Sequence, residues 1–237
     1  MFLPTTIKEV RARGWEQLDV ILFSGDAYID HPAFGAAVIG RLLEAEGYRV
    51  AIVPQPNWRD DLRDFIKLGT PRLFFGITAG SMDSMVNHYT ANLRLRSNDA
   101  YTPGGKAGFR PDYAVKVYTQ ILKRLFPHVP VVVGGIEASL RRLTHYDYWN
   151  DSLKPSVLAE SGADLLIYGM GERVVQQVAR ALRNGYNAKL LRKLRQVAFM
   201  AGKDYVERLD PAKTIRLHSY EECARDKRAF GENFTII

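Results

Sequence analysis

Short runs of hydrophobic residues alternate along the chain with segments in which hydrophobic residues recur every three or four positions. The runs are rich in β-branched and aromatic residues, as is typical of strands buried on both faces of a sheet. They predict strands at residues 19–23, 48–53, 73–78, 129–133 and 163–168. The periodic segments predict helices at residues 35–46, 58–68, 112–125 and 172–184. Gly47 and Gly185 follow two of these helices, in the position where glycine commonly ends a helix.

Strands and helices that alternate at this spacing predict parallel strands joined by crossover helices. We therefore predict an α/β fold with a doubly wound, mostly parallel, flavodoxin-like sheet. Residues 196–201 are a candidate for one further strand. Residues 79–111 form a connection far longer than usual, and we expect it to lie over the sheet edge where ligands bind, as a lid or a partner surface.

The last part of the chain has weaker periodicity than the rest. Residues 186–237 end on Phe-Thr-Ile-Ile, an apolar run with nothing after it, so we expect a chain cut from a longer protein. We predict one α/β domain over residues 1–205. Residues 206–237 are then a linker or the start of a following region.

Composition narrows the class of protein. The chain is 46% hydrophobic and 25% charged, which is ordinary for a globular protein. No apolar run approaches the roughly 20 residues that span a bilayer, and the N-terminus lacks the apolar core of a signal peptide. The single cysteine, Cys223, excludes an internal disulfide and favours the cytoplasm. A net charge of +7 suits a phosphate-bearing ligand or RNA.

Three glycine-containing turns directly follow predicted strands: SGD at 24–26, GGIEAS at 134–139 and GMGE at 169–172. In parallel α/β folds these strand ends meet at the edge where ligands bind. Glycine there lets a backbone approach a ligand closely, and the helix that follows favours negative charge. The three turns therefore predict a ligand site at the carboxyl edge of the sheet.

Several of the polar residues in these turns have a structural alternative. Asp26 or Asp30 is a candidate cap for the helix that begins at residue 35. Glu172, at the start of a helix, is placed to interact with the helix dipole. Residues 137–151 crowd arginines beside aromatic residues, which suits stacking on a base or a partner, or an amphipathic segment packed on the lid.

Familiar catalytic and nucleotide-binding motifs are missing from the sequence. The first turn has no G-x-G-x-x-G, and the chain has no G-x-x-x-x-G-K-[ST], G-x-S-x-G or H-E-x-x-H. These absences argue against nicotinamide, ATP and common hydrolase sites.

The segments FSGDAYIDHPAFG, FFGITAGSMDSMVNHYTA, AYTPGG, VVVGGIEASLRRLTHYDYW and GMGE resemble the amino-terminal region of YgiQ-type radical SAM proteins. The resemblance implies a cobalamin-binding-like domain ahead of a core that holds a 4Fe-4S cluster on C-x-x-x-C-x-x-C and binds S-adenosylmethionine. That motif is absent here, and one cysteine cannot replace the three thiolates it supplies. The chain alone is therefore expected to be an accessory domain, with the radical SAM core downstream in the same polypeptide.

The same resemblance implies cobalamin as a possible ligand of this chain. One branch of cobalamin domains carries D-x-H-x-x-G after the first strand, S-x-L after the third and a glycine pair after the fourth. Here residues 30–35 place aspartate and histidine side by side, with glycine one position late, so the spacing does not predict ligation of cobalt by His31. Ser81 stands near the second motif, and Gly134 and Gly135 match the third.

The candidate cofactor-binding residues share a place at or just after a strand end. They are Gly25, Asp26, Asp30, His31, Ser81, Gly134, Gly135, Glu137, Gly169, Gly171 and Glu172. No residue is assigned to catalysis or to a metal.

Two other functions are weighed beside cobalamin binding. A hydrolase would use Asp26, Asp30 and His31. A basic interaction domain that presents RNA or another substrate, without a cofactor of its own, would use Arg94, Arg96, Lys106, Arg110, Arg141 and Arg142.

Overall fold

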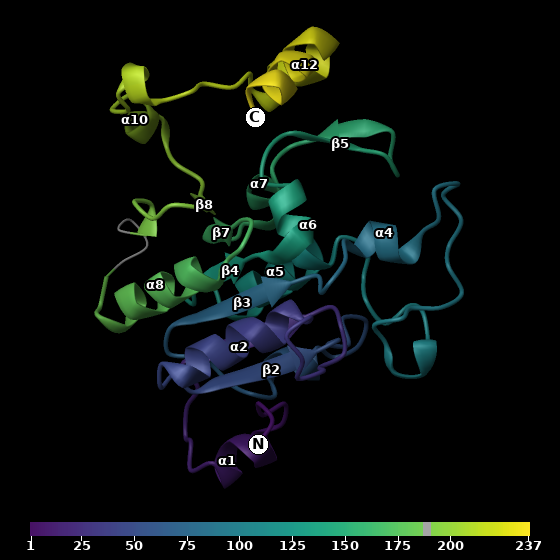
Figure 1. Cartoon of the computed structure of the whole chain (residues 1–237), viewed down its shortest axis with the longest axis vertical. Coiled ribbons are helices and arrows are strands. Elements are labelled where there is room, and N and C mark those ends of the chain that lie inside the picture. The colour runs from purple at the N-terminus through teal and green to yellow at the C-terminus, as the bar shows by residue number, and fades with distance from the viewer. Residues whose placement is uncertain (187–190) are drawn as a thin grey trace.

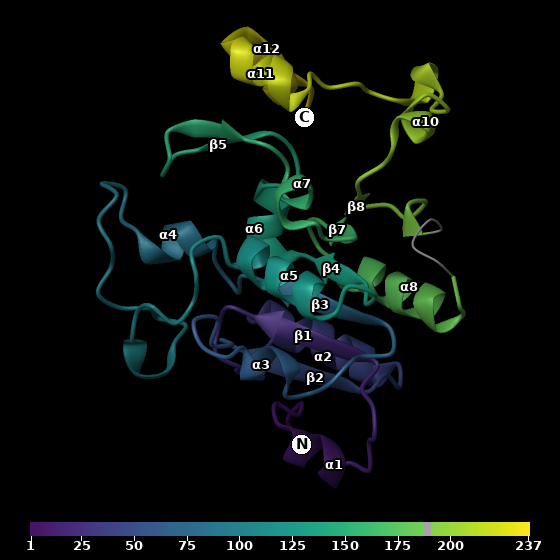
Figure 2. The same ribbon diagram turned by 180° about the vertical axis from the view of Figure 1, so that it is seen from behind.

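A six-stranded sheet forms the centre of the molecule, seen in a computed structural model that describes residues 1–186 and 191–237 (Figures 1 and 2). Its order is β2-β1-β3-β4-β7-β8, and only β8 runs antiparallel to its neighbour. The strands are β1 Val20–Ser24, β2 Val50–Pro54, β3 Phe74–Thr78, β4 Val131–Val133, β7 Leu165–Ile167 and β8 Val197–Ala198. The five predicted strands and the further strand within 196–201 are confirmed. The parallel part has the flavodoxin order. In this order, successive strands are added on one side of β1 and then on the other, so the strand order reverses between β1 and β3.

Helices cover both faces of this sheet. α2 (Gly35–Ala45) and α8 (Glu172–Arg183) lie on one face, toward the viewer in Figure 1. α3 (Arg63–Ile66), α5 (Ala114–Leu125) and α7 (Val157–Ser161) lie on the other, which Figure 2 shows. α6 (Gly135–Leu140) follows β4 directly and contacts β3 and β7. The result is the three-layered, doubly wound architecture that the alternation of strands and helices predicts.

The strands are apolar at nearly every position because both of their faces are covered. Alternate residues point to opposite faces, so Leu22 packs under α2 while Phe23 points to the α3 side. The ring of Phe23 stacks on Phe65 of α3 at 5.3 Å and meets Phe75 of β3 edge-on at 5.8 Å. These aromatic contacts fix α3 to the sheet although the helix is short.

The helix predicted at residues 58–68 is much shorter in the structure, where only α3 forms. Asp60 accepts a hydrogen bond from the backbone N–H of Leu62, and Asp61 accepts one from that of Arg63. Leu62 has a φ of 60°. The two carboxylates hold the backbone in a turn, and the chain therefore becomes helical only after them.

The long connection at residues 79–111 contains a helix, α4 (Ser84–His88), and a short 3-10 helix, η1 (Pro103–Gly105). The connection lies beyond the ends of the sheet strands, where Figures 1 and 2 label its helix α4. Asp83 begins α4 by accepting hydrogen bonds from the backbone N–H groups of Met85 and Val86. We call residues 79–111 the lid.

Several elements lie outside the predicted pattern. A hairpin of β5 and β6 follows α6, and the C-terminal α11 packs against β6. The sequence reasoning missed these elements because all but α12 are too brief to show periodicity, and the periodicity of the C-terminal segment that contains α12 is weak. They are α1 Ile7–Ala12, β5 His145–Asp147, β6 Ser152–Lys154, α10 Lys203–Val206, η2 Pro211–Lys213, α11 Tyr220–Arg225 and α12 Lys227–Ile236.

The outer edge of β2 is not left open. The N-terminal segment runs beside it, and the backbone N–H of Ile52 donates to the carbonyl of Pro4 at 2.9 Å. On the opposite side the sheet ends in β8, which has only two residues. None of the helices in the described ranges is both long enough and apolar enough to cross a membrane.

Substitution of Phe75 tests how much the aromatic contacts stabilise the sheet. The ring of Phe75 is fully buried and contacts both Phe23 and Phe126. Phe75→Ala is expected to lower the free energy of unfolding by about 3–5 kcal/mol, because it leaves a cavity that its neighbours cannot fill. Urea denaturation measures this change. Phe234→Ala is the matched control, since Phe234 is 81% exposed; an equal loss in both variants would contradict the assignment of the core.

Candidate functional site

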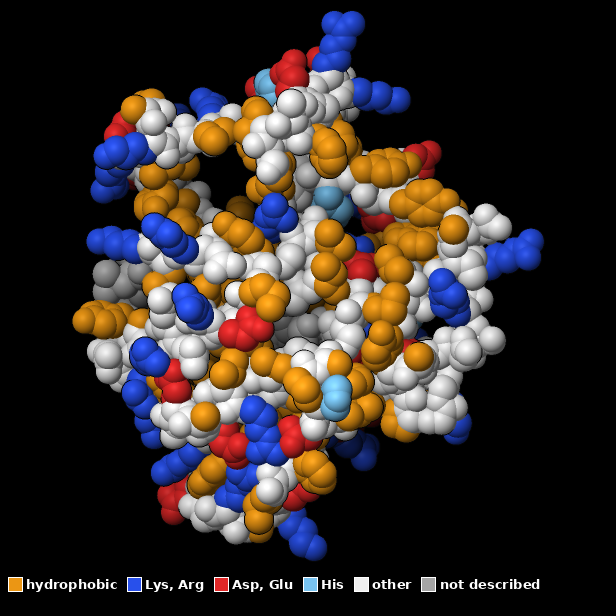
Figure 3. All heavy atoms as spheres, viewed as in Figure 1, with side chains coloured by type: hydrophobic (Ala, Val, Ile, Leu, Met, Phe, Trp, Pro, Cys, Tyr) orange, Lys and Arg blue, Asp and Glu red, His pale blue; other side chains and the backbone are white. Residues whose placement is uncertain are grey.

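A cavity of about 270 Å³ opens at the carboxyl edge of the sheet; we call it the edge cavity. Its floor is formed by β1, β3, β4 and β7, and its walls by α2 and α8. Loop residues 32–36, 134–135 and 169–172 surround its mouth. Figure 3 shows this face, where hydrophobic side chains gather around a recess beside α2. The cavity lies at the β1/β3 switch point, where open α/β sheets bind their ligands.

Glycines give the edge cavity much of its room. Gly134, Gly135, Gly169 and Gly171 all line it, as the sequence predicts for residues at this edge. Gly135 has a φ of 82°, and a Cβ there would lie 2.5 Å from the Thr78 hydroxyl, so the turn after β4 accepts only glycine.

One glycine of the cavity was missed by the sequence reasoning. A Cβ on Gly76, in the middle of β3, would lie 2.6 Å from Leu22 Cδ2, in the floor of the cavity. The signal was a single glycine inside an otherwise apolar strand, which marks a close approach of another group.

Glu172 also lines the edge cavity and is the first residue of α8. It is therefore the one predicted acidic residue that lines the cavity. Its place in the first turn also suits a favourable interaction with the helix dipole. The position of Glu172 is therefore consistent with both interpretations, the helix-dipole interaction and the ligand site.

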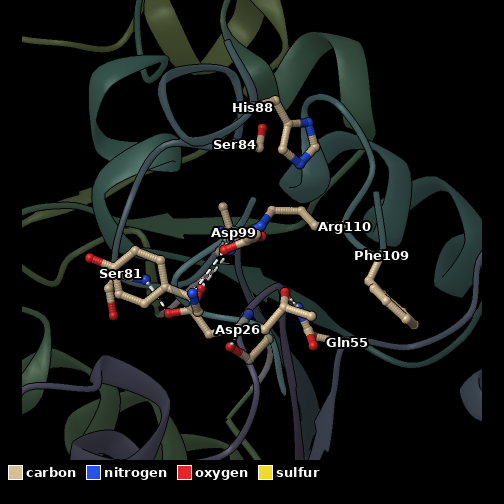
Figure 4. Close-up of polar contacts among 12 residues, drawn as sticks. Asp26, Gln55, Ser81, Ser84, His88, Asp99, Phe109 and Arg110 are labelled. Atoms are coloured by element: carbon tan, nitrogen blue, oxygen red, sulfur yellow. Dashed lines mark hydrogen bonds and ion pairs between the residues drawn. The ribbon is translucent and has the colours of Figure 1, made fainter. Parts of the chain in front are cut away.

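A second cluster of residues does not line the edge cavity but holds the lid against the sheet. We call this cluster, centred on Arg110, Asp26 and Asp99, the anchor of the lid. Arg110 of the lid is fully buried, and its Nη2 lies 3.0 Å from Asp26 Oδ1 and 3.1 Å from Asp99 Oδ2. Its Nη1 donates to the carbonyl of Ala79 at 2.8 Å. Figure 4 shows Arg110 between the two carboxylates. One guanidinium thus joins the end of β1, the start of the lid and the far end of the lid.

Gly25, Asp26 and Ser81 all belong to this anchor. The backbone N–H of Ser81 donates to Asp26 Oδ2 at 2.6 Å. Burial raises the pKa of Asp26, although the Ser81 N–H and Arg110 both favour its charged form. A Cβ on Gly25 would lie 2.1 Å from the Ala79 carbonyl oxygen, so the two strand ends meet only because residue 25 is glycine.

Asp30 and His31 lie apart from Asp26, on the surface loop before α2. Asp30 pairs with Arg41, whose hydrogen bonds lower the pKa of the carboxylate. His31 is exposed, and its Nδ1 accepts a hydrogen bond from the backbone N–H of Ala33 at 3.1 Å. The structure therefore does not assemble Asp26, Asp30 and His31 into a hydrolase site.

The capping interpretation of the aspartates is also wrong. The residue before α2 is Phe34, which makes no side-chain hydrogen bond to the helix. Asp26 and Asp30 are instead held by arginines, and such charged pairs bind a carboxylate more strongly than neutral backbone donors do.

Glu137 does not line the edge cavity, although Gly135 two residues before it does; its side chain lies on the buried side of α6. Its carboxylate accepts hydrogen bonds from the backbone N–H groups of Ser84, at 2.8 Å, and Val115, at 2.9 Å. Burial raises its pKa against the effect of these donors. The side chain links the lid helix α4 to α5, so its role in this structure is to position the lid.

Two of the basic residues expected on an interaction surface are buried. Arg110 anchors the lid, and Arg141 pairs with Asp83 at the start of α4. Burial lowers the pKa of the Arg141 guanidinium. In the arginine–aromatic segment 137–151, Arg141 is therefore buried and has a structural role, while Tyr146 and Tyr148 are exposed. The sequence reasoning did not separate these two groups.

Metal-binding potential is low in the part of the chain that the structure describes. It contains no group of three His, Cys, Asp or Glu side chains placed to hold an ion. Cys223 is buried in α11, and burial raises the pKa of its thiol. These residues do not fit an iron–sulfur cluster.

The order of the strands and the edge cavity define a flavodoxin-like α/β domain with a ligand-sized recess at its switch point. The chain matches the family described as Radical SAM N-terminal over residues 2–237, and it belongs to that family. The resemblance to the amino-terminal region of YgiQ-type proteins is thereby confirmed.

Named relatives of the chain are much longer than it is. It is 64% identical to a UPF0313 protein of Porphyromonas gingivalis and 60% identical to one of Bacteroides thetaiotaomicron, in both cases over its whole length. It is 50% identical to one of Thermotoga maritima over 98% of the chain. The chain covers 37% of the first relative and 40% of the other two.

Solved structures give a more distant likeness. A structure of TsrM from Kitasatospora setae, a radical S-adenosylmethionine methyltransferase with cobalamin and a [4Fe-4S] cluster bound, aligns with a TM-score of 0.48. The alignment covers 76% of this chain and 28% of TsrM, at 19% identity.

The anchor of the lid yields a stability prediction. Arg110→Met removes the cation between two buried carboxylates and is expected to lower the free energy of unfolding by about 3–5 kcal/mol. Arg94→Met, in an exposed part of the same lid, is expected to change it by less than about 0.5 kcal/mol. Chemical denaturation of both variants measures the difference. Equal stabilities would show that Arg110 does not anchor the lid.

Proposed function

We propose that this domain binds cobalamin at the carboxyl edge of its sheet and carries it for a radical SAM core that follows in the same polypeptide. The edge cavity is the observation on which the proposal rests. It is apolar, lies at the switch point of the sheet, and is surrounded by loops that expose backbone groups at Gly135, Gly169 and Gly171.

The size of the edge cavity suits one part of such a ligand. Pockets that enclose a drug-sized molecule measure about 300–1,000 Å³, so about 270 Å³ is too small for a corrin ring with its nucleotide tail. The flat, apolar base of the tail fits the cavity, which has Gly76 in its floor and aliphatic side chains around it. The corrin ring would then rest on the glycine-containing loops at the mouth.

The hydrogen bond at His31 bears on how the cobalt would be held. Because Nδ1 accepts from the Ala33 N–H, a neutral His31 carries its proton on Nε2 and offers no lone pair there. Ligation through Nε2 would require the proton to move to Nδ1 and the bond to Ala33 to break. We therefore propose binding without a histidine ligand from below.

The remaining chemistry belongs to the rest of the longer protein. A radical SAM core supplies a 4Fe-4S cluster and S-adenosylmethionine, and three thiolates are needed to hold that cluster. Because this chain has one cysteine, we propose that it does not catalyse a reaction alone. Residues 206–237, with α11 against the β5–β6 hairpin, would lead from this domain toward the core.

A titration with hydroxocobalamin, followed by absorbance and thermal shift, tests this proposal. Gly35→Phe places a ring at the mouth of the edge cavity, where a Cβ meets no neighbour within 4 Å, and is expected to weaken binding at least about tenfold. Gly231→Phe is the matched control, because its Cβ is equally unhindered and lies in α12. The proposal fails if the wild-type chain does not bind, or if both variants bind equally well.

Substitution of His31 separates binding from ligation. His31→Ala is expected to keep the affinity for hydroxocobalamin within about threefold of wild type, because a lost contact at an exposed side chain costs about 0.5 kcal/mol or less. The absorbance spectrum of the complex is expected to stay the same as well. A changed spectrum together with lost affinity would identify His31 as the cobalt ligand.

A further inference from the structure

A second cavity, of about 390 Å³, lies between the lid and the loop that follows β2; we call it the lid cavity. Trp58 and Arg59 come from that loop, while α4 and residues 95–112 supply most of the remaining wall. The lid cavity shares no lining residue with the edge cavity. The proposed function therefore leaves it without a role.

The walls of the lid cavity contain buried polar groups that have no hydrogen-bond partner among the described residues. They are Nε2 of His88, the amide nitrogen of Asn87 and Nε of Arg110. Residues His88 and Asn87 are each only 7% exposed. Buried polar groups in native proteins are nearly always paired with protein, water or a ligand. Three in one cavity wall therefore point to something that binds there.

The ring of His88 is held in one orientation. Its Nδ1 lies 2.6 Å from Asp112 Oδ1, and Asp112 Oδ2 accepts a hydrogen bond from Tyr89 at 2.8 Å. Figure 4 shows the ring extending from α4 toward Arg110. Since Asp112 accepts the proton of Nδ1, the other nitrogen is left for a ligand.

The charges around the lid cavity favour an anion. Arg59 and Arg96 stand at its rim, and neither forms an ion pair within residues 1–186 and 191–237. Arg59 stacks on Trp58 at 4.1 Å and donates to the Gly108 carbonyl, and Arg96 donates to the Tyr89 carbonyl. The wall carboxylates, Asp99 and Asp112, are already engaged. Both guanidinium groups are thus held in place with donors to spare.

We propose that the lid cavity binds the phosphate or carboxylate group of a small molecule. Arg59 and Arg96 supply the charge, the Asn87 amide and His88 supply hydrogen bonds inside, and Trp58 offers a flat wall to the rest of the ligand. A small molecule fits better than a nucleic acid because the unpaired groups of Asn87 and His88 are buried and do not lie on the surface.

Nuclear magnetic resonance of the histidine rings tests the proposal directly, with inorganic phosphate and acetate as probes on the 237-residue chain. The chain has five histidines, and His88→Gln identifies the resonance of His88. Phosphate or acetate is expected to shift this resonance saturably, with a dissociation constant of about 1 mM or below for the better probe. The better probe shows whether the ligand carries phosphate or carboxylate. If neither anion shifts the His88 resonance, the proposal is overturned.

A matched pair of arginine variants separates a built site from general attraction. Arg96→Gln is expected to weaken binding of the better probe about tenfold. Arg94→Gln, two positions away in the exposed lid and not in the cavity wall, is expected to leave it within about twofold. Equal losses in both variants would mean that the anion is attracted by surface charge alone, which overturns the proposal.

Two further arms complete the experiment. A short single-stranded RNA that shifts the His88 resonance when phosphate and acetate do not would assign the cavity to nucleic acid and overturn the small-molecule proposal. Gly35→Phe, which blocks the edge cavity, is expected to leave binding of the better probe unchanged. Failure at one cavity is therefore distinguishable from failure at the other.

Discussion

The buried contact between Arg110, Asp26 and Asp99 decides how the carboxyl edge of this sheet is divided. The guanidinium of Arg110 also donates to the carbonyl of Ala79. One planar group therefore reaches the ends of two strands and the far end of the lid. A lysine would not serve, because a point charge on a flexible stem lacks the fixed fork of donors that three such partners require. Two carboxylates share one cation there, and the low exposure of the cluster makes each contact strong and the loss of any partner costly.

The position of this anchor leaves the edge cavity open. The lid is drawn toward the α3 and α5 side of the sheet, where it forms the lid cavity with the Trp58 loop. The lid was predicted to cover the ligand edge, and in the structure none of its residues lines the edge cavity on the α2 and α8 side. The two recesses differ in chemistry as well, since one is apolar with backbone groups at its mouth and the other is lined by buried polar side chains.

The sequence predicts the sheet well because hydrophobic runs and periodic segments report burial directly. It fails at α3, where Asp60 and Asp61 bind nearby backbone and stop a helix whose apolar residues are correctly spaced. It also places Asp26 at the correct edge of the sheet. It cannot show that Asp26 pairs with Arg110, because that contact depends on how a long connection folds back.

The sequence therefore places all candidate site residues together at the strand ends. It does not show which side of the sheet each of them faces. Gly134, Gly135, Gly169, Gly171 and Glu172 reach the edge cavity, while Gly25, Asp26 and Ser81 belong to the lid anchor. Strand ends alone do not distinguish these two groups. Gly76 shows that the distinction has a sequence signal in one place, since a glycine inside an apolar strand marks where a neighbouring side chain, here Leu22, approaches the backbone closely.

The way the sheet ends on its two sides limits how this domain joins other structure. The N-terminal segment binds β2 through Pro4 and Ile52, and β8 presents only two residues on the opposite side. Strand-to-strand pairing, by which exposed sheet edges attract other chains, therefore has little to build on. The surface that the domain offers for contacts with other structure therefore consists mainly of its loops and helices.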